Sequence, residues 1–170
     1  MIRKLALAAL AAGLLATPAL AADKLKVETS KGCSFEITLR PDLAPKHVAQ
    51  ITKLAKDGFY NGIIFHRVID GFMAQTGDPT GTGMGGSKLP NVKAEFTQEP
   101  FKRGTVGMAR SSDPDSGNSQ FFIMFAPGDF LNGQYTVWGQ VDEAGMACVD
   151  KIERGEPPAK PDKMTKVTVE

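Results

Sequence analysis

The sequence holds little of what metal centres and nucleic-acid binders require. Two histidines and two cysteines occur in 170 residues, which is scant material for a metal cluster. The 20 Lys and Arg residues nearly balance the 19 Asp and Glu residues, so the strong positive charge of a nucleic-acid binder is missing. The hydrophobic fraction of 42% and charged fraction of 23% are ordinary for a globular domain. We expect one domain with no bound metal and no nucleic-acid partner.

Several catalytic motifs are also missing. The chain contains no nucleophile elbow, no Walker A motif, no H-E-x-x-H and no C-x-x-C, which disfavours a serine hydrolase, a nucleotide hydrolase, a zinc protease and a thiol oxidoreductase. A G-x-G-x-x-G pattern is present at residues 81–86, between Pro79 and Pro90. A dinucleotide site needs a helix after this pattern, and Pro90 stops one. We interpret the segment as a glycine-rich loop and His47, on an expected helix, as a solvent-exposed residue.

The N-terminus has the layout of a secretory signal peptide. Arg3 and Lys4 precede an uncharged run of Leu, Ala and Gly, and small residues stand at Ala19 and Ala21. This order of basic, apolar and small residues is typical of a cleavable signal. The alternative is an uncleaved membrane anchor, although Pro18 interrupts the apolar run.

We expect residues 1–21 to be removed, with cleavage after Ala21 or Ala22, leaving residues 22–170 as the mature protein. The removed segment carries two positive charges and no negative one, so the mature chain is close to neutral. No later run is long and apolar enough to span a membrane. These observations predict a periplasmic protein that does not contact the membrane after cleavage. We also expect it to be a monomer.

Export leaves the state of the two cysteines open. An oxidising compartment permits a disulfide between Cys33 and Cys148. The alternative is that both are small, half-buried hydrophobic residues. The sequence does not give their separation in space, so both interpretations stand.

The patterning predicts a mainly β protein with two helices. Residues 24–29 and 33–39 alternate apolar and polar side chains around a glycine-containing turn, which indicates a β-hairpin. From Ala44 to Lys56 the apolar spacing becomes helical, with Pro45 in the first turn and Gly58 as a stop signal. We expect further strands at 63–69, 72–75, 105–109, 121–125, 136–141 and 164–169, and a second short helix at 146–152. Such a series of short strands suggests a β-sandwich or β-barrel.

Three segments mix apolar side chains with long polar ones. Phe72, Met73 and Phe122 could line a pocket, and Arg67, Gln75 and Gln120 could supply hydrogen-bond donors at its rim. An apolar cavity with a few convergent polar groups is the usual form of a small binding site. The alternative is that the aromatic residues belong to the core, but Arg67 weakens it because arginine is rarely buried without a partner.

The blocks FHRVIDGFMAQTGD at 65–78, GMAR at 107–110 and SQFFI at 119–123 resemble the cyclophilin-type peptidyl-prolyl cis-trans isomerases. The resemblance runs from about Leu25 to Val169, and it is strongest to the exported bacterial branch. It implies a closed eight-stranded antiparallel β-barrel capped by two α-helices. The protein would then isomerise X–Pro bonds in unfolded or nascent exported polypeptides, without a cofactor.

The resemblance also implies roles for individual residues. Arg67 matches the catalytic arginine of the family. The remaining matches are to residues that bind the proline ring or the flanking peptide: Phe72, Met73, Gln75, Met108, Ala109, Arg110, Gln120, Phe122, Phe130, Leu131 and Tyr135.

Three of these positions depart from common family members. Arg110 stands where the family often has asparagine, Phe130 where many eukaryotic members have tryptophan, and Tyr135 where they have histidine. Phenylalanine lacks the indole N–H donor of tryptophan, so the resemblance does not extend to a prediction of sensitivity to the cyclic peptide cyclosporin. Isomerase activity is still expected. The alternative function is a non-catalytic proline-peptide binding module or holdase chaperone that uses the same groove. Trp138 is expected in the core.

Overall fold

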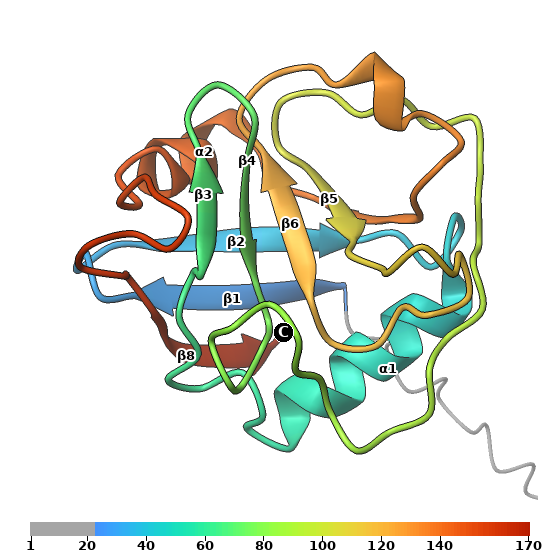
Figure 1. Ribbon diagram of the computed structural model, residues 1–170, viewed down its shortest axis with the longest axis horizontal. Coiled ribbons are helices and arrows are strands. Elements are labelled where there is room, and N and C mark those ends of the chain that lie inside the picture. The colour runs from blue at the N-terminus through green and yellow to red at the C-terminus, as the bar shows by residue number, and fades with distance from the viewer. Residues whose placement is uncertain (1–22) are drawn as a thin grey trace, which may run out of the picture.

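The computed structural model describes residues 23–170, so the expected signal peptide lies outside the described residues. The described part consists of eight strands, two α-helices and one short 3-10 helix (Figure 1). No helix in residues 23–170 has both the length and the apolar character to cross a membrane. The elements are β1 (Lys24–Thr29), β2 (Ser34–Leu39), α1 (Pro45–Lys56), β3 (Arg67–Ile69), β4 (Met73–Thr76), β5 (Thr105–Met108), β6 (Phe121–Met124), η1 (Asp129–Leu131), β7 (Val137–Gln140), α2 (Glu143–Val149) and β8 (Met164–Val169).

The strands form one antiparallel sheet in the order β3-β4-β6-β5-β7-β2-β1-β8. The mainly β prediction is therefore confirmed. The sheet curls into a half-barrel with β3 and β8 at its two edges. An isolated bridge between Ile64 and Lys163 lies near these edges, and no ladder joins them among residues 23–170. The closed barrel that the resemblance implied is not confirmed.

The predicted hairpin is confirmed, because β1 and β2 pair with Val27 opposite Phe35. The helix α1 begins at Pro45, and its buried side is formed by the residues that the spacing indicated. The second helix begins three residues earlier than expected, at Glu143, because the Asp142 carboxylate caps it by accepting a hydrogen bond from the Gly145 N–H at 2.7 Å.

The concave side of the sheet holds the main core. We call these residues the core cluster, and its largest members include Leu25, Ile37, Ile51, Phe65, Phe121, Ile123 and Trp138. The helix α1 packs against β7 and β8, and α2 packs against β2, so the two helices lie at opposite ends of the half-barrel (Figure 1). Trp138 is fully buried, as expected.

A disulfide fastens α2 to the sheet. Cys33, just before β2, is bonded to Cys148 in α2, with their Cα atoms 5.8 Å apart, an ordinary separation for a disulfide. The Thr29 hydroxyl lies 3.5 Å from one sulfur and 3.6 Å from the other. Of the two interpretations open at the sequence level, the structure shows the disulfide.

The prediction that His47 is solvent-exposed is wrong. Its exposed fraction is 1%, and its Nδ1 lies 2.6 Å from a carboxylate oxygen of Glu95. The same carboxylate accepts hydrogen bonds from the backbone N–H groups of Lys46 and His47. The pKa of His47 is lowered, because burial disfavours the charged ring more strongly than the Glu95 carboxylate favours it. A side chain from the distant loop between β4 and β5 thus covers the first turn of α1.

Candidate functional site

The convex side of the sheet carries a second cluster of hydrophobic residues. Along β6, Phe121 and Ile123 enter the core cluster, whereas Phe122 and Met124 point to the opposite side. This division follows from the alternation of side chains along a strand. We call the second group the pocket cluster; its buried members are Met73, Phe101, Phe122, Met124, Leu131 and Val137.

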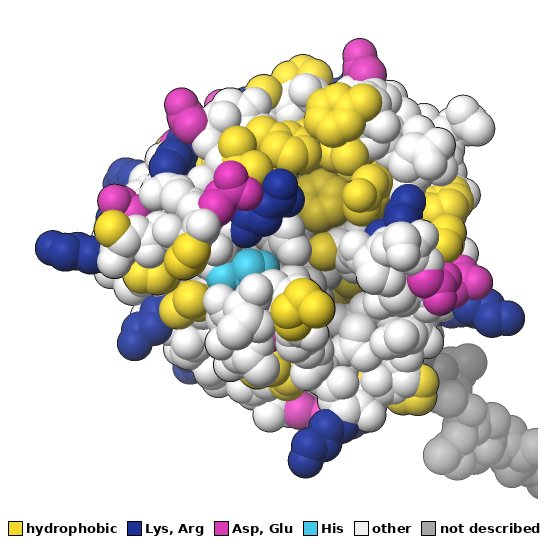
Figure 2. Space-filling model, in the orientation of Figure 1, with side chains coloured by type: hydrophobic (Ala, Val, Ile, Leu, Met, Phe, Trp, Pro, Cys, Tyr) yellow, Lys and Arg dark blue, Asp and Glu magenta, His cyan; other side chains and the backbone are white. Residues whose placement is uncertain are grey.

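A cavity of about 490 Å³ opens beside the pocket cluster. Figure 2 shows hydrophobic side chains gathered around this hollow, with basic side chains and a histidine at its edge. The volume falls within the usual range for small-molecule and peptide sites. The lining comes from β3, β4, β6, η1 and the segments that connect the elements: His66, Arg67, Phe72, Met73, Gln75, Gly81, Thr82, Gly83, Ala109, Arg110, Phe122, Leu131, Tyr135, Glu156 and Pro157.

Aromatic contacts hold the apolar floor of the cavity in place. Phe122 stacks on Phe101 with ring centroids 5.7 Å apart and meets the edge of Tyr135 at the same distance. Phe72 packs against Phe130 with centroids 5.5 Å apart. The rings are thereby fixed before any ligand arrives, which favours binding of a flat apolar group.

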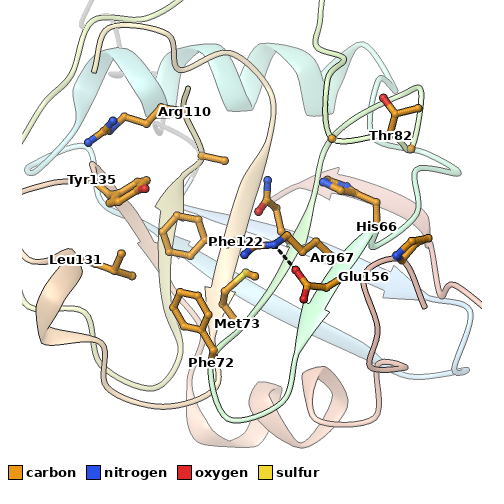
Figure 3. Close-up of a pocket in the computed structure, with 15 residues that line it drawn as sticks. His66, Arg67, Phe72, Met73, Thr82, Arg110, Phe122, Leu131, Tyr135 and Glu156 are labelled. Carbon is orange, nitrogen blue, oxygen red and sulfur yellow. Dashed lines mark hydrogen bonds and ion pairs between the residues drawn. The ribbon is translucent and has the colours of Figure 1, made fainter. Parts of the chain in front are cut away.

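Arg67 forms the polar side of the cavity. The first residue of β3 points outward while Val68 points into the core. The Arg67 Nε donates a hydrogen bond of 2.8 Å to a carboxylate oxygen of Glu156. The close-up shows the guanidinium beside Met73 and Phe122, with Glu156 on its other side (Figure 3).

Two glutamines connect the cavity to the glycine-rich loop. Gln75 donates to the side-chain oxygen of Gln120 at 2.9 Å, and Gln120 donates to the backbone carbonyls of Gly83 and Gly85. Gln120 lines a neighbouring hollow rather than the first cavity, and Gln75 lines both. The two polar residues predicted beside the peptide backbone therefore lie together at the border between the hollows.

Asp78 organises the glycine-rich loop. Its carboxylate accepts hydrogen bonds from the backbone N–H groups of Thr80, Thr82, Gly83 and Gly85 and from the Thr80 hydroxyl. Burial alone raises the pKa of this carboxyl, but these hydrogen bonds outweigh burial and bring it to about 2. No helix follows the loop within the described chain up to β5, so the geometry is not that of a dinucleotide site.

Arg110 and Tyr135 form the opposite rim. The guanidinium of Arg110 lies 4.6 Å from the centroid of the Tyr135 ring and donates to the backbone carbonyl of Gln134. A cation over an aromatic face is attracted by the ring quadrupole. The pair therefore forms one side of the cavity, and Arg110 also lines the neighbouring hollow.

The structure places three of the predicted binding residues outside the lining of this cavity: Gln120, which lines the neighbouring hollow, Met108 and Phe130. The side chain of Met108 is 2% exposed and belongs to the core cluster, so it does not line the cavity. This residue ends β5, where the alternation directs Met108 inward and Ala109 toward the cavity. Phe130 is 70% exposed and reaches the rim through Phe72.

Sequence reasoning missed six lining residues, namely His66, Gly81, Thr82, Gly83, Glu156 and Pro157, of which His66 and Glu156 carry titratable side chains. His66 is 6% exposed, and neither of its ring nitrogens has a hydrogen-bond partner. Burial lowers its pKa and so favours the neutral ring, although the charge of Asp78 acts in the opposite direction. Its position beside Arg67 was a usable signal. Glu156 had no such signal, because it lies 89 residues from Arg67 in the sequence.

The described chain is thus an antiparallel half-barrel with an apolar cavity on one face, and Arg67 and Arg110 stand on opposite sides of that cavity. The family model of cyclophilin type peptidyl-prolyl cis-trans isomerases matches residues 24–169. The chain belongs to this family and is a peptidyl-prolyl cis-trans isomerase.

The relatives agree with this assignment. A probable peptidyl-prolyl cis-trans isomerase of Brucella suis is 57% identical over 150 residues, covering 79% of this chain and 76% of the relative. The crystal structure of cyclophilin AquaCyp293 from Hirschia baltica has a TM-score of 0.78 and 32% identity, covering 86% of this chain and 73% of that one. A Cryptosporidium parvum cyclophilin, crystallised in the presence of the dipeptide Ala-Pro, has a TM-score of 0.78 and 27% identity, covering 86% and 98% of the two chains.

Proposed function

We propose that this isomerase acts on X–Pro bonds of unfolded or nascent exported polypeptides in the periplasm, as a monomer, with Arg67 as the catalytic residue. The observation that carries the proposal is the position of the Arg67 guanidinium directly beside the apolar cavity. The Ala-Pro dipeptide named with the Cryptosporidium relative supports a proline-containing ligand for the same cavity here.

The chemistry explains why one arginine and an apolar cavity suffice. Rotation about an X–Pro bond crosses a barrier of about 18–20 kcal/mol, because the amide has partial double-bond character. No bond is made or broken, so the enzyme has only to favour the twisted state over the two planar states. In the twisted state the prolyl nitrogen regains a lone pair, which accepts a hydrogen bond that the planar amide nitrogen cannot accept.

Each group at the cavity has a part in this scheme. Phe72, Met73, Phe122 and Leu131 hold the proline ring while the preceding carbonyl swings. The guanidinium of Arg67 donates a charge-assisted hydrogen bond to the prolyl nitrogen. The remaining contacts hold the peptide on either side of the proline, and they come from Gln75, Gln120, Tyr135 and the backbone at Ala109 and Arg110.

The catalytic role of Arg67 is tested by Arg67→Ala in a short X–Pro peptide assay. We expect kcat to fall at least about a hundredfold with a smaller change in KM, because the lost bond belongs to the transition state. An unchanged melting temperature would show that the fold is retained, since Arg67 is on the surface. Near-full activity of the variant would contradict the proposal.

A holdase would bind the same chains without accelerating isomerisation. Refolding of a protein limited by a proline isomerisation separates the two functions. We expect acceleration at substoichiometric amounts of the wild-type enzyme and none with Arg67→Ala. If refolding yield improves only at stoichiometric amounts, and equally with both proteins, the chain acts as a holdase.

Export and oligomeric state need separate measurements. We expect the protein in the periplasmic fraction of an expressing bacterium with an outer membrane, with a mature N-terminus at Ala22 or Asp23 by mass spectrometry. Light scattering should give the mass of a monomer. A product that keeps residues 1–21 and sediments with membranes would support the anchor alternative instead.

A further inference from the structure

We infer that Glu156 is a positioning residue of this enzyme, which fixes the Arg67 guanidinium in its productive orientation. This inference rests on the catalytic role proposed for Arg67. Glu156 lines the cavity together with Arg67, and its carboxylate accepts the 2.8 Å hydrogen bond from Nε.

Backbone pairing places Glu156 opposite Arg67. Val68 and Gly155 form an antiparallel bridge, with each backbone N–H donating to the other carbonyl at 2.8 Å. In an antiparallel pair the residue before Val68 faces the residue after Gly155, so Arg67 faces Glu156. The meeting of the two side chains is therefore a consequence of the backbone register.

A second ion pair fastens the same loop to the same hairpin. Arg154 donates from Nε to Asp70 at 3.1 Å, and its guanidinium lies 4.2 Å from the centroid of the Phe125 ring. Arg154 also donates to the carbonyls of Asp150 and Ile152. The loop that carries Glu156 is thus held in place independently of Arg67, which makes its carboxylate a fixed acceptor.

The geometry of the bond leaves the catalytic nitrogens free. Glu156 accepts its hydrogen bond from Nε, at the side of the guanidinium. Within residues 23–170 this is the one hydrogen bond that the Arg67 side chain forms. The guanidinium is planar and rigid, so fixing Nε also fixes the directions of both terminal nitrogens. A donor held in place loses less conformational freedom when the transition state forms.

Other polar groups nearby do not perform this task. Gln75 gives its amide N–H to Gln120, and Asp70 faces Arg154. His66 forms no hydrogen bond to the guanidinium. Among the described residues, Glu156 supplies the carboxylate that orients Arg67.

The ion pair is suited to orientation rather than to stability. The side chains of Arg67 and Glu156 are 44% and 55% exposed, and exposed ion pairs contribute little to the free energy of unfolding. Replacement of Glu156 should therefore change catalysis without unfolding the protein, which makes the inference testable by kinetics.

The experiment compares kcat and KM for Glu156→Ala, Glu156→Gln and the matched control Asp70→Asn. We expect Glu156→Ala to lower kcat about tenfold with KM within about twofold of wild type. Glu156→Gln keeps an acceptor oxygen and should recover most of the loss. Asp70→Asn breaks the other ion pair of the same loop, and its kcat should stay within about twofold of wild type.

The double variant Arg67→Ala/Glu156→Ala completes a double-mutant cycle for these two residues. Because Glu156 acts through Arg67, the double variant should be no slower than Arg67→Ala alone. Wild-type or raised kcat in Glu156→Ala would overturn the inference, as would equal losses in Glu156→Ala and Asp70→Asn. If Arg67→Ala itself keeps wild-type activity, the proposed role of Arg67 fails, and that result is distinct from a failure confined to Glu156.

Discussion

The two faces of the half-barrel are built from the same strands but have different roles. On β6, Phe121 and Ile123 are sealed into the core cluster, and their neighbours Phe122 and Met124 belong to the pocket cluster. The core cluster is closed by two helices and a disulfide. Of the pocket cluster, Met73, Phe122 and Leu131 line the cavity, whereas Phe101, Met124 and Val137 are buried away from it.

This difference separates stability from activity between the core cluster and the exposed rim of the cavity. A residue of the core cluster is surrounded on all sides, so its removal leaves a void. A residue at the cavity rim already borders solvent, so its removal costs less stability but takes away contact with the substrate. We therefore expect substitutions on the two faces to affect different measurements.

The largest expected effect on stability comes from Phe121→Ala. The Phe121 ring packs edge-on against Tyr60 and Trp138, with centroids 5.6 and 5.3 Å apart. We expect a loss of about 3–5 kcal/mol in the free energy of unfolding by urea titration. Under conditions where the variant is folded, kcat should stay near the wild-type value. A loss of kcat without a loss of stability would break the distinction between the faces.

The next effect comes from the disulfide on the core side. Cys33 and Cys148 enclose a loop with a sequence separation of 115. Replacing both cysteines with serine should lower the free energy of unfolding by about 2–4 kcal/mol, with no change in kcat because the disulfide does not line the cavity. Wild-type protein in reductant should show the same change. If the variant unfolds at the same urea concentration as the wild type, the expectation is wrong.

Phe72→Ala should show the reverse behaviour. Phe72 is half-buried and lines the cavity, so we expect kcat/KM to fall about tenfold, which corresponds to about 1.4 kcal/mol of lost transition-state binding. The melting temperature should change little. Phe130→Ala is the matched control, because that ring is 70% exposed and touches the cavity only through Phe72; its loss should be smaller. Equal losses for the two variants would contradict this assignment.

The smallest effect is a dependence of stability on pH. Burial lowers the pKa values of both His47 and His66, so the unfolded chain binds protons more readily than the folded protein. Stability is therefore highest above the ordinary histidine pKa of about 6.5 and falls as the pH drops below it. Urea midpoints at pH 5.5 and 7.5 measure the difference. The variant His47→Gln/His66→Gln should lose this slope, and an unchanged slope would assign it to other groups.

Much of the fold follows from local patterns in the sequence. The alternation of apolar and polar side chains predicted the hairpin of β1 and β2, and the helical spacing of apolar side chains predicted α1. The start of α2 was missed because it depends on a cap at Asp142 rather than on apolar spacing. The open edges of the sheet were missed because a barrel closes only if its two edge strands, β3 and β8, pair with each other. Local periodicity in the sequence contains no information about pairing between distant strands.

The candidate site was predictable where its residues share a strand or a motif. Arg67, Met73 and Gln75 come together because β3 and β4 are paired, with Arg67 opposite Gln75. The errors arose where a distant partner decides the outcome. His47 is buried by Glu95, 48 residues away, and Glu156 reaches Arg67 through the bridge between Val68 and Gly155.

The bridge between Val68 and Gly155 also covers part of an open edge of the sheet. The strand β3 has three residues and lies at an open edge of the sheet, and an uncovered edge can recruit another chain as an additional strand and begin aggregation. Gly155 occupies both backbone hydrogen-bonding groups of Val68. The β3 edge of the sheet is therefore covered at Val68, where an extended polypeptide could otherwise add as a further strand.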